Sequence, residues 1–205
     1  MLRRFFDIAF SCLLLLIAAP VFLAIAVAVS LDGGPVFYWQ TRAGIHGRRF
    51  EIVKFRSMRP NRLSTAELAI AHGQIDCAHP EVTRVGRFIR RFKLDEVPQL
   101  INVLRGEMSI IGPRPTVLEQ VFDYTPYQWH RLDVLPGLTG WAQVNGGIEL
   151  EWPDRILLDV WYVVHRSPWL DAAILFRTAM VVLFGESRNA NALMKAEQYA
   201  CSHTA

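Results

Sequence analysis

The feature that most constrains the fold is a long apolar stretch near the start of the chain. From Ile8 to Leu31 no residue carries a charge. A continuous helix of this length crosses the hydrocarbon core of a bilayer, which is about 30 Å thick. The stretch is therefore compatible with a spanning anchor, with a re-entrant hairpin that enters and leaves by the same face, or with a signal peptide cleaved near Ala24-Ile25-Ala26.

Two observations favour the re-entrant hairpin. Pro20 lies near the centre of the stretch, and a proline inside a helix removes a hydrogen bond and kinks the axis. Each half then has about 12 residues, or roughly 18 Å of helix, which is too short to cross a bilayer alone. Because positively charged flanks stay in the cytoplasm, we predict a membrane hairpin over residues 1–33, broken at Pro20. The basic flanking residues are Arg3 and Arg4 before the stretch and Arg42, Arg48 and Arg49 after it.

The remainder is predicted to be a mainly helical α+β domain over residues 34–185, followed by a C-terminal tail, 186–205, that frays. Short aromatic and β-branched runs between glycines predict a β-hairpin or small sheet at 36–56. Val85, Phe88, Ile89 and Phe92 lie at helical spacing and predict an amphipathic helix that stops before Pro98. A second short helix is expected to end at Gly106. The mostly apolar segment 170–185 predicts a core helix or an amphipathic helix in the membrane interface.

Composition limits the partners. The 205 residues carry a net charge of only +3, which gives no reason to expect a nucleic acid partner, and that charge is unevenly distributed. Between Arg42 and Lys93 there are 12 Lys and Arg against 4 Asp and Glu. The three cysteines match no metal or redox spacing, and a reducing cytoplasmic setting fits them best.

Asp95 and Glu96 are adjacent carboxylates that follow this basic region, at the expected C-terminal end of the amphipathic helix. Adjacent residues on a helix point about 100° apart, so one carboxylate can meet a reacting atom while the other binds a metal ion. Carboxylates at a helix C-terminus oppose the macrodipole, so this placement has no obvious stabilising value. The alternative interpretation is an ordinary ion pair between Arg91 and Asp95 at i,i+4 spacing, with the carboxylates also adding negative charge at the N-terminus of the next helix.

Two further segments have the character of binding loops. In "IIGPRP", residues 110–115, two prolines hold Arg114 in extended geometry, which suits bidentate binding of a phosphate. The alternative there is a rigid turn with an arginine in solvent. In "PGLTGWAQVNGG", residues 136–147, glycines allow close backbone approach to a nucleotide, with the amides of Gln143 and Asn145 nearby. The alternative there is a pair of β-turns.

These residues together form a candidate site for a diphosphate. Asp95 and Glu96 are expected to supply a nucleophile and a ligand for Mg²⁺, which prefers carboxylates and substrate phosphates. An adjacent membrane hairpin would deliver a lipid substrate. The basic groups expected to hold the phosphates are Lys54, Arg56, Arg90 and Arg114.

The order of the motifs resembles the bacterial sugar transferases, monotopic phosphoglycosyl transferases that begin exopolysaccharide and other glycan assembly on undecaprenyl phosphate. The resemblance runs from about Leu2 to Gly185. It rests on "KFRSM" at 54–58, "GRFIRRFKLDEVPQLINVLRGEMSIIGPRP" at 86–115, "PGLTGWAQVNG" at 136–146 and "DVWYV" at 159–163. So many motifs in one order are highly specific.

The resemblance implies a hairpin in the bacterial inner membrane and a catalytic domain on its cytoplasmic face. Asp95 would attack the β-phosphate of a UDP-sugar and release UMP. The phosphosugar-aspartyl enzyme would then pass hexose-1-phosphate, of the galactose or glucose type, to undecaprenyl phosphate. Glu96 would bind Mg²⁺ beside Asp95. Arg90 and Arg114 would bind phosphate, and Asp159 would help to order the site. The rival interpretation is a non-catalytic, membrane-anchored binding protein of the same fold.

Three features depart from the family's usual pattern. The stretch that leads into the catalytic helix usually reads Asp-Pro-Arg, and here it reads His79-Pro80-Glu81. A serine usually precedes the helix-breaking proline, and Ala19 stands there, so the break lacks a hydroxyl that would satisfy a freed carbonyl. An arginine commonly follows the Asn-Gly pair, and Gly147 stands there. If that arginine binds the donor, this chain must use another arginine, for which Arg155 is the candidate, or prefer a different donor.

Overall fold

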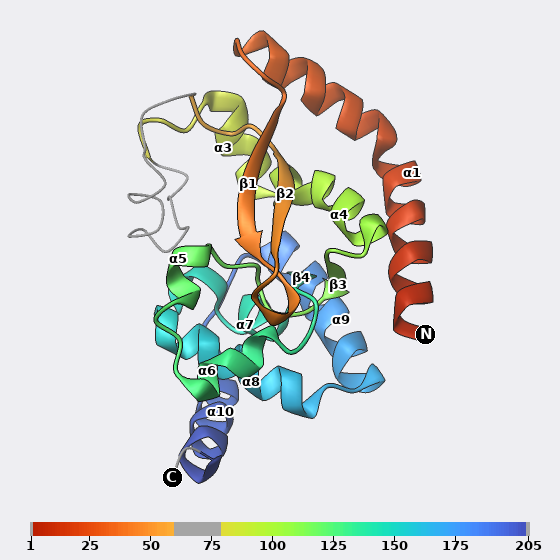
Figure 1. Cartoon of the computed structure of the whole chain (residues 1–205). Helices are drawn as coiled ribbons and strands as arrows, with labels where there is room; N and C mark the ends of the chain where they lie inside the picture. The colour runs from red at the N-terminus through yellow and green to blue at the C-terminus, as the bar shows by residue number, and fades with distance from the viewer. Residues whose placement is uncertain (1, 60–78, 204–205) are drawn as a thin grey trace. The chain divides into compact units, whose positions relative to one another are not determined.

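The computed structural model describes residues 2–59 and 79–203, and these residues are mainly helical, as predicted (Figure 1). The chain divides into two compact units, which are described one at a time below. The first unit comprises Met1–Arg42 and Phe50–Met108, and the second comprises Ala43–Arg49 and Ser109–Ala205.

The first unit begins with α1 (Leu2–Leu31), a single helix that contains Pro20. Its ribbon changes direction about half-way along (Figure 1). The predicted helix-break-helix is therefore one bent helix here, because a proline removes only one helical hydrogen bond and the turns on both sides continue. Whether this helix forms a re-entrant hairpin in a membrane stays a prediction.

α1 has the length and composition of a membrane helix. Within the described residues it is the helix that is long and apolar enough to cross a bilayer, with a mean hydropathy of 3.0 in its most apolar window. Only 11% of that window is buried within the protein, and large side chains such as Leu16 and Leu23 are exposed. An apolar surface of this extent calls for a non-aqueous neighbour.

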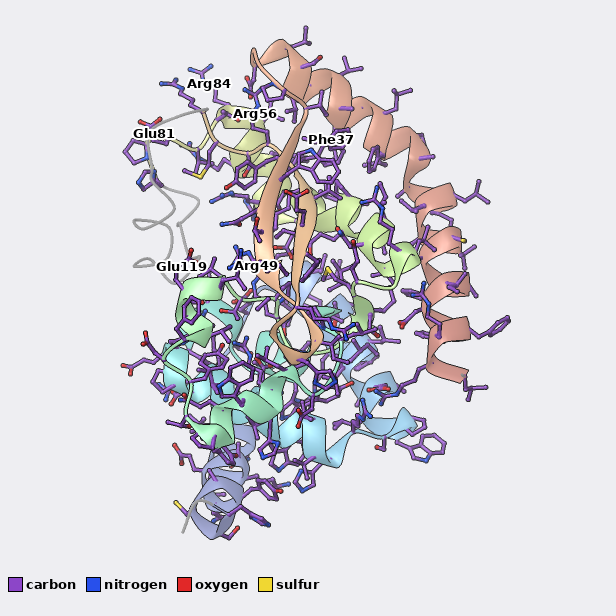
Figure 2. All side chains as sticks on the ribbon, in the orientation of Figure 1. Phe37, Arg49, Arg56, Glu81, Arg84 and Glu119 are labelled. Carbon is purple, nitrogen blue, oxygen red and sulfur yellow. The ribbon has the colours of Figure 1, made fainter. Side chains whose placement is uncertain are left out.

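The C-terminal half of α1 packs into the core of the first unit. Ile25 and Val29 contact Phe55 and Ile89. The ring of Phe37, which is labelled in Figure 2, stacks on that of Phe55 with the centroids 5.5 Å apart. Phe55 belongs to β2 (Arg49–Phe55), which pairs with β1 (Phe37–Ala43) in a two-stranded sheet. The strands confirm the predicted hairpin over 36–56.

The expected amphipathic helix is α3 (Arg84–Arg91), capped by the Thr83 hydroxyl, which accepts a hydrogen bond of 2.8 Å from the Gly86 amide. It ends earlier than predicted because Lys93 adopts left-handed geometry with a φ of 58°. A 3₁₀ helix, η2 (Leu94–Gln99), follows and leads into α4 (Leu100–Arg105). Gly106 ends α4 with a φ of 82°, as predicted.

The second unit is built on a short parallel pair, β3 (Ser109–Ile111) and β4 (Gly137–Thr139), in which Ser109 is paired with Gly137. Helices surround this pair, and one core cluster joins Ala43, Val121 and Val160. The helices of the unit, in chain order, are α5 (Leu118–Val121), α6 (Pro126–Trp129), η3 (His130–Leu132), α7 (Trp141–Val144), η4 (Gly147–Glu149), α8 (Trp152–His165), α9 (Pro168–Phe184) and α10 (Ala190–His203), with η1 (Ile45–Gly47) in the β1–β2 connection.

The last two helices differ in how much of their surface is covered. In α9, which the structure describes throughout, only Ile174 is buried, and apolar side chains such as Trp169 and Phe184 are exposed. The place of α9 in a membrane interface stays a prediction. The expectation that the tail frays is wrong. α10 packs on α8 and buries Leu193 and Ala196, because small and apolar residues recur along one of its faces.

Candidate active site

The first unit places Asp95 and Glu96 in the first turn of η2, and each residue is only 9% exposed. Their predicted position at the C-terminal end of a helix is therefore wrong. The left-handed turn at Lys93 ends α3 before the pair and begins a new helical turn that contains them. Carboxylates are favoured at a helix N-terminus by the macrodipole. The same turn interrupts the helical i,i+4 register on which an Arg91–Asp95 pair would depend.

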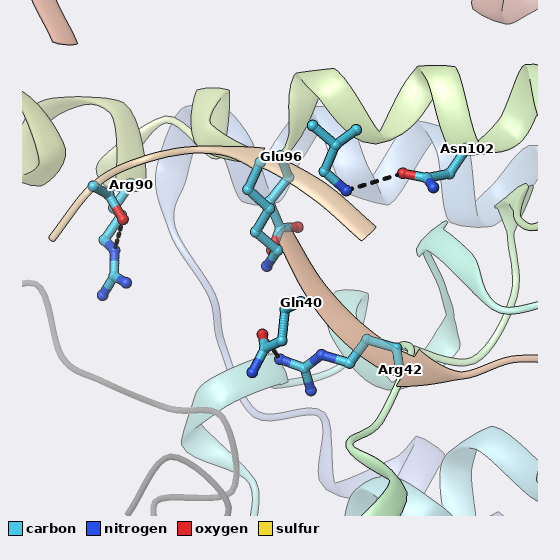
Figure 3. Close-up of polar contacts among 8 residues, drawn as sticks. Gln40, Arg42, Arg90, Glu96 and Asn102 are labelled. Carbon is cyan, nitrogen blue, oxygen red and sulfur yellow. Dashed lines mark hydrogen bonds and ion pairs between the residues drawn. The ribbon is translucent and has the colours of Figure 1, made fainter. Parts of the chain in front are cut away.

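The Lys54 side chain holds the second carboxylate of the pair. Its Nζ lies 2.8 Å from Oε1 of Glu96, and the two side chains are 16% and 11% exposed. At such partly buried positions an ion pair is screened less than at the surface. Lys54 comes from β2 and Glu96 from η2, so the pair also joins the strand to the turn that carries Asp95 (Figure 3).

Arg90 is held near the end of the same strand. Its Nε donates to Oγ of Ser57 at 2.8 Å, as Figure 3 shows. This bond uses one edge of the guanidinium and fixes its direction. The first unit thus brings four of the predicted site residues, Lys54, Arg90, Asp95 and Glu96, onto three neighbouring segments: β2, α3 and η2.

Asn102 is a residue of this region that the sequence analysis missed. It is fully buried in α4, and its Oδ1 accepts a hydrogen bond from the Val53 amide at 3.2 Å. Its Nδ2 donates to the Glu51 carbonyl and to Oε2 of Glu107, both at 2.7 Å. One amide therefore ties α4 to β2 beside Lys54 (Figure 3). A single Asn in a short helix carries no sequence signal that would have identified this role.

Asp95 and Glu96 can supply only part of the ligands of the predicted Mg²⁺, and a substrate would have to supply others. Among the residues that the structure describes, there is no cluster of three or more His, Cys, Asp or Glu side chains that could hold a metal ion. Mg²⁺ usually binds one or two carboxylates and completes its octahedron with water and substrate phosphates. Asp95 and Glu96 match that donor set.

In the second unit, Asp159 is bound to an arginine that the sequence analysis did not single out. Nε of Arg131 lies 2.8 Å from Oδ2 of Asp159, and the two side chains are 2% and 1% exposed. Arg131 also donates to the Tyr124 hydroxyl and, at 2.9 Å, to the carbonyl of Arg114. Asp159 thus orders the "IIGPRP" segment indirectly, through Arg131, while the Arg114 side chain is exposed.

Burial raises the pKa of Asp159 to about 6, although the charges of Arg131, Arg155 and Arg114 act in the opposite direction. Arg155 is held too: it donates to the carbonyl of Ile148 at 3.0 Å and to that of Leu150. Its pKa is lowered by burial and then by the charge of Arg114. In this conformation Arg155 therefore supports the loop before α8.

The two amides of the glycine-rich segment differ. Asn145 is fully buried, and its Oδ1 accepts from Arg177 at 2.6 Å and from Asn189 at 2.9 Å. Gln143 has buried side-chain O and N atoms without a hydrogen-bond partner in the described part of the chain. A buried amide in that state is expected to meet a water molecule or a ligand, so Gln143 fits a binding role better than Asn145.

Gly147, where the family's pattern commonly has arginine, is enclosed by the tail. It has a φ of +49°, and a Cβ built there would lie 2.2 Å from Oε2 of Glu186. The same oxygen accepts a hydrogen bond of 2.6 Å from the Ile148 amide. A side chain at position 147 would therefore displace Glu186.

Comparison with known proteins assigns the chain. The family model described as bacterial sugar transferase matches residues 1–185. The chain belongs to the bacterial sugar transferase family.

Its relatives fall into two groups by length. It is 42% identical to the undecaprenyl-phosphate galactose phosphotransferase of Salmonella typhimurium over 89% of this chain and 40% of that protein. It is 41% identical to the UDP-glucose:undecaprenyl-phosphate glucose-1-phosphate transferase of Escherichia coli over 87% of this chain and 39% of that protein. The chain thus spans about two fifths of these two relatives. It is 39% identical to the uncharacterized sugar transferase EpsL of Bacillus subtilis, over 98% of this chain and 96% of that protein.

Asn102→Ala is expected to lower the free energy of unfolding by about 3 kcal/mol, because the Val53 amide and the Glu51 carbonyl both lose a buried partner, at about 1–3 kcal/mol each. The measurement is thermal unfolding of the purified protein, from which the change in the free energy of unfolding is obtained. Arg105→Ala, an exposed change in the same helix, is the control and should stay within about 0.5 kcal/mol. An Asn102→Ala protein as stable as this control would contradict the assigned role.

Gly147→Ala is expected to lower the free energy of unfolding. An alanine in left-handed geometry costs about 1–2 kcal/mol, and the clash of its Cβ with Glu186 adds to this cost. Gly185→Ala is the matched control, since Gly185 has a φ of +95° and open space around its Cβ. Adding Glu186→Ala should recover part of the loss at Gly147 and none at Gly185, as measured by thermal unfolding in a double-mutant cycle. Additive losses in both pairs would disprove the packing of Glu186 against position 147.

Proposed function

We propose that the protein transfers hexose-1-phosphate from a UDP-sugar to undecaprenyl phosphate, with galactose or glucose as the hexose. The names of the Salmonella typhimurium and Escherichia coli relatives support this acceptor and these two sugars. The observation that carries the proposal is the Lys54–Glu96 ion pair beside Asp95 in a nearly buried turn. It gives two adjacent carboxylates different roles.

In the proposed reaction Asp95 is the nucleophile. Its carboxylate oxygen forms a bond to the β-phosphorus of the UDP-sugar, and the bond from that phosphorus to the bridging oxygen breaks. UMP leaves with the electron pair, and the hexose phosphate remains as an acyl phosphate on Asp95. A phosphate oxygen of undecaprenyl phosphate then attacks the same phosphorus, which releases the Asp95 carboxylate and forms the lipid diphosphate-sugar.

The neighbouring charges reduce the repulsion between a carboxylate nucleophile and an anionic substrate. Lys54 offsets the charge of Glu96 at 2.8 Å, and the guanidinium of Arg90, which donates to Ser57, is proposed to bind phosphate oxygens. Mg²⁺, held by Glu96 and Asp95 together with substrate phosphates, would supply further neutralisation of charge. Arg114 and Gln143 remain proposed donor-binding residues in the second unit.

We further propose that α1 anchors the protein in the bacterial inner membrane with the catalytic residues on the cytoplasmic face. The exposed apolar surface of α1 supports membrane association. Basic residues on both sides of the apolar stretch, such as Arg4 and Arg42, favour the cytoplasm for both flanks. A membrane-embedded helix would bring the protein to its lipid acceptor.

Asp95→Asn is expected to reduce transfer by at least about 1,000-fold, since loss of a catalytic nucleophile removes the step that starts the reaction. The measurement is UMP release from UDP-galactose and UDP-glucose with Mg²⁺ and undecaprenyl phosphate. Asp123→Asn, an exposed change, is the control and should leave the rate unchanged. Full activity of Asp95→Asn would refute the mechanism. An inactive wild-type protein that binds the lipid would favour a non-catalytic binding protein.

A further inference from the structure

Arg56, labelled in Figure 2, lies directly after β2. Its guanidinium donates hydrogen bonds to backbone carbonyls at the end of α1. Its Nη2 donates to the Val29 carbonyl at 2.7 Å, and its Nη1 donates to the Gly33 carbonyl. The residue is only 5% exposed. Its third nitrogen, Nε, is buried without a hydrogen-bond partner among the described residues. Little of the guanidinium remains available to a phosphate.

The end of α1 needs such a partner. The last carbonyls of a helix have no amide partner within the helix, and they carry the negative end of its macrodipole. The last turn of α1 contains no basic residue. Arg56 supplies both a positive charge and hydrogen bonds, from a residue that is 27 positions away from Val29.

The turn after α1 is shaped around this guanidinium. Gly33 and Gly34 have φ values of 75° and 104°, a region that glycine adopts at little cost. A Cβ at Gly34 would lie 2.6 Å from Nη1 of Arg56. The backbone amide of Arg56 also donates to the Val36 carbonyl at 2.9 Å. Arg56 is therefore bound on both its side chain and its backbone to the segment that leaves the helix.

The same short segment holds the candidate active site. Lys54, two residues before Arg56, pairs with Glu96, and Ser57, the next residue, accepts from Arg90. A Cβ at Gly86 of α3 would lie 1.9 Å from the Ser57 carbonyl oxygen, so the strand end and α3 are in close contact. Within residues 54–57, Lys54 thus binds Glu96, Arg56 binds the end of α1, and Ser57 binds Arg90.

We propose that Arg56 is a positioning residue which fixes the end of the apolar helix to the strand that holds Lys54 and Ser57. It sets the place of the carboxylate pair relative to α1 and does not bind the donor's phosphates. Sequence reasoning grouped Arg56 with the phosphate-binding residues because it lies in a basic motif. This inference rests on the proposed transferase function for its kinetic consequence, whereas its structural part is independent of that function.

Arg56→Met is expected to lower kcat by about 10- to 100-fold, because a displacement of about 1 Å at a reacting group has an effect of this size. The KM for the UDP-sugar should stay within about twofold of the wild-type value, since a residue that does not contact the donor contributes nothing to the binding of the substrate in its ground state. Arg56→Lys keeps the positive charge but loses the planar guanidinium that reaches two carbonyls. Its kcat should therefore lie between that of wild type and that of Arg56→Met. Arg59→Met, an exposed arginine three residues along, is the control and should match wild type.

Hydrogen–deuterium exchange of the full chain in detergent tests the structural part alone. The amides of Gly33, Gly34 and Val36 should exchange faster in Arg56→Met than in wild type and Arg59→Met. Unchanged exchange would overturn the proposal, even if the protein proved inactive with every UDP-sugar. A raised KM with wild-type kcat and exchange would instead show that Arg56 contacts the donor. If Arg56→Met does not fold, Arg56→Lys carries both measurements.

Discussion

The ion pair between Lys54 and Glu96 is the interaction on which the candidate active site depends. Two carboxylates in one nearly buried turn repel each other and an incoming diphosphate. Lys54, at 2.8 Å, compensates one of the two charges and ties the turn to β2. The other carboxylate, Asp95, is the proposed nucleophile, and it lies in the turn that this ion pair ties to β2. The left-handed Lys93, which ends α3 early, is what places both carboxylates at the start of a helical turn.

Buried polar side chains hold the rest of each unit in place. In the first unit, Asn102 ties α4 to β2, and Arg56 ties β2 to the end of α1. In the second unit, Arg131 joins Asp159 to the backbone of Arg114. Each of these side chains donates hydrogen bonds to the backbone of another segment or accepts them from it, and the bonds to the buried residues Val53 and Val29 satisfy groups that would be costly to leave unpaired. A motif can therefore contain residues that touch substrate and residues that only support those that do.

The sequence predicted the elements and the carboxylate pair better than it predicted the supporting contacts. Hydrophobic periodicity and glycines identified α3, the β-hairpin and the end of α4, because these signals are local. The break of α3 at Lys93 has no such signal, since lysine rarely adopts positive φ. Arg56 and Asp159 were identified as site residues, but their partners, Val29, Gly33 and Arg131, are distant in sequence. Only the fold reveals that Glu186 fills the space at Gly147.

In the proposed reaction, Asp95 carries the phosphosugar during turnover. The most direct measurement is mass spectrometry of the wild-type protein after acid quenching, with UDP-galactose or UDP-glucose and Mg²⁺ present and the lipid acceptor absent. A hexose phosphate adduct is expected on the peptide that contains Asp95, and it should disappear when undecaprenyl phosphate is added. An adduct on another residue, or UMP formation that requires the acceptor and leaves no adduct, would contradict the proposed role of Asp95.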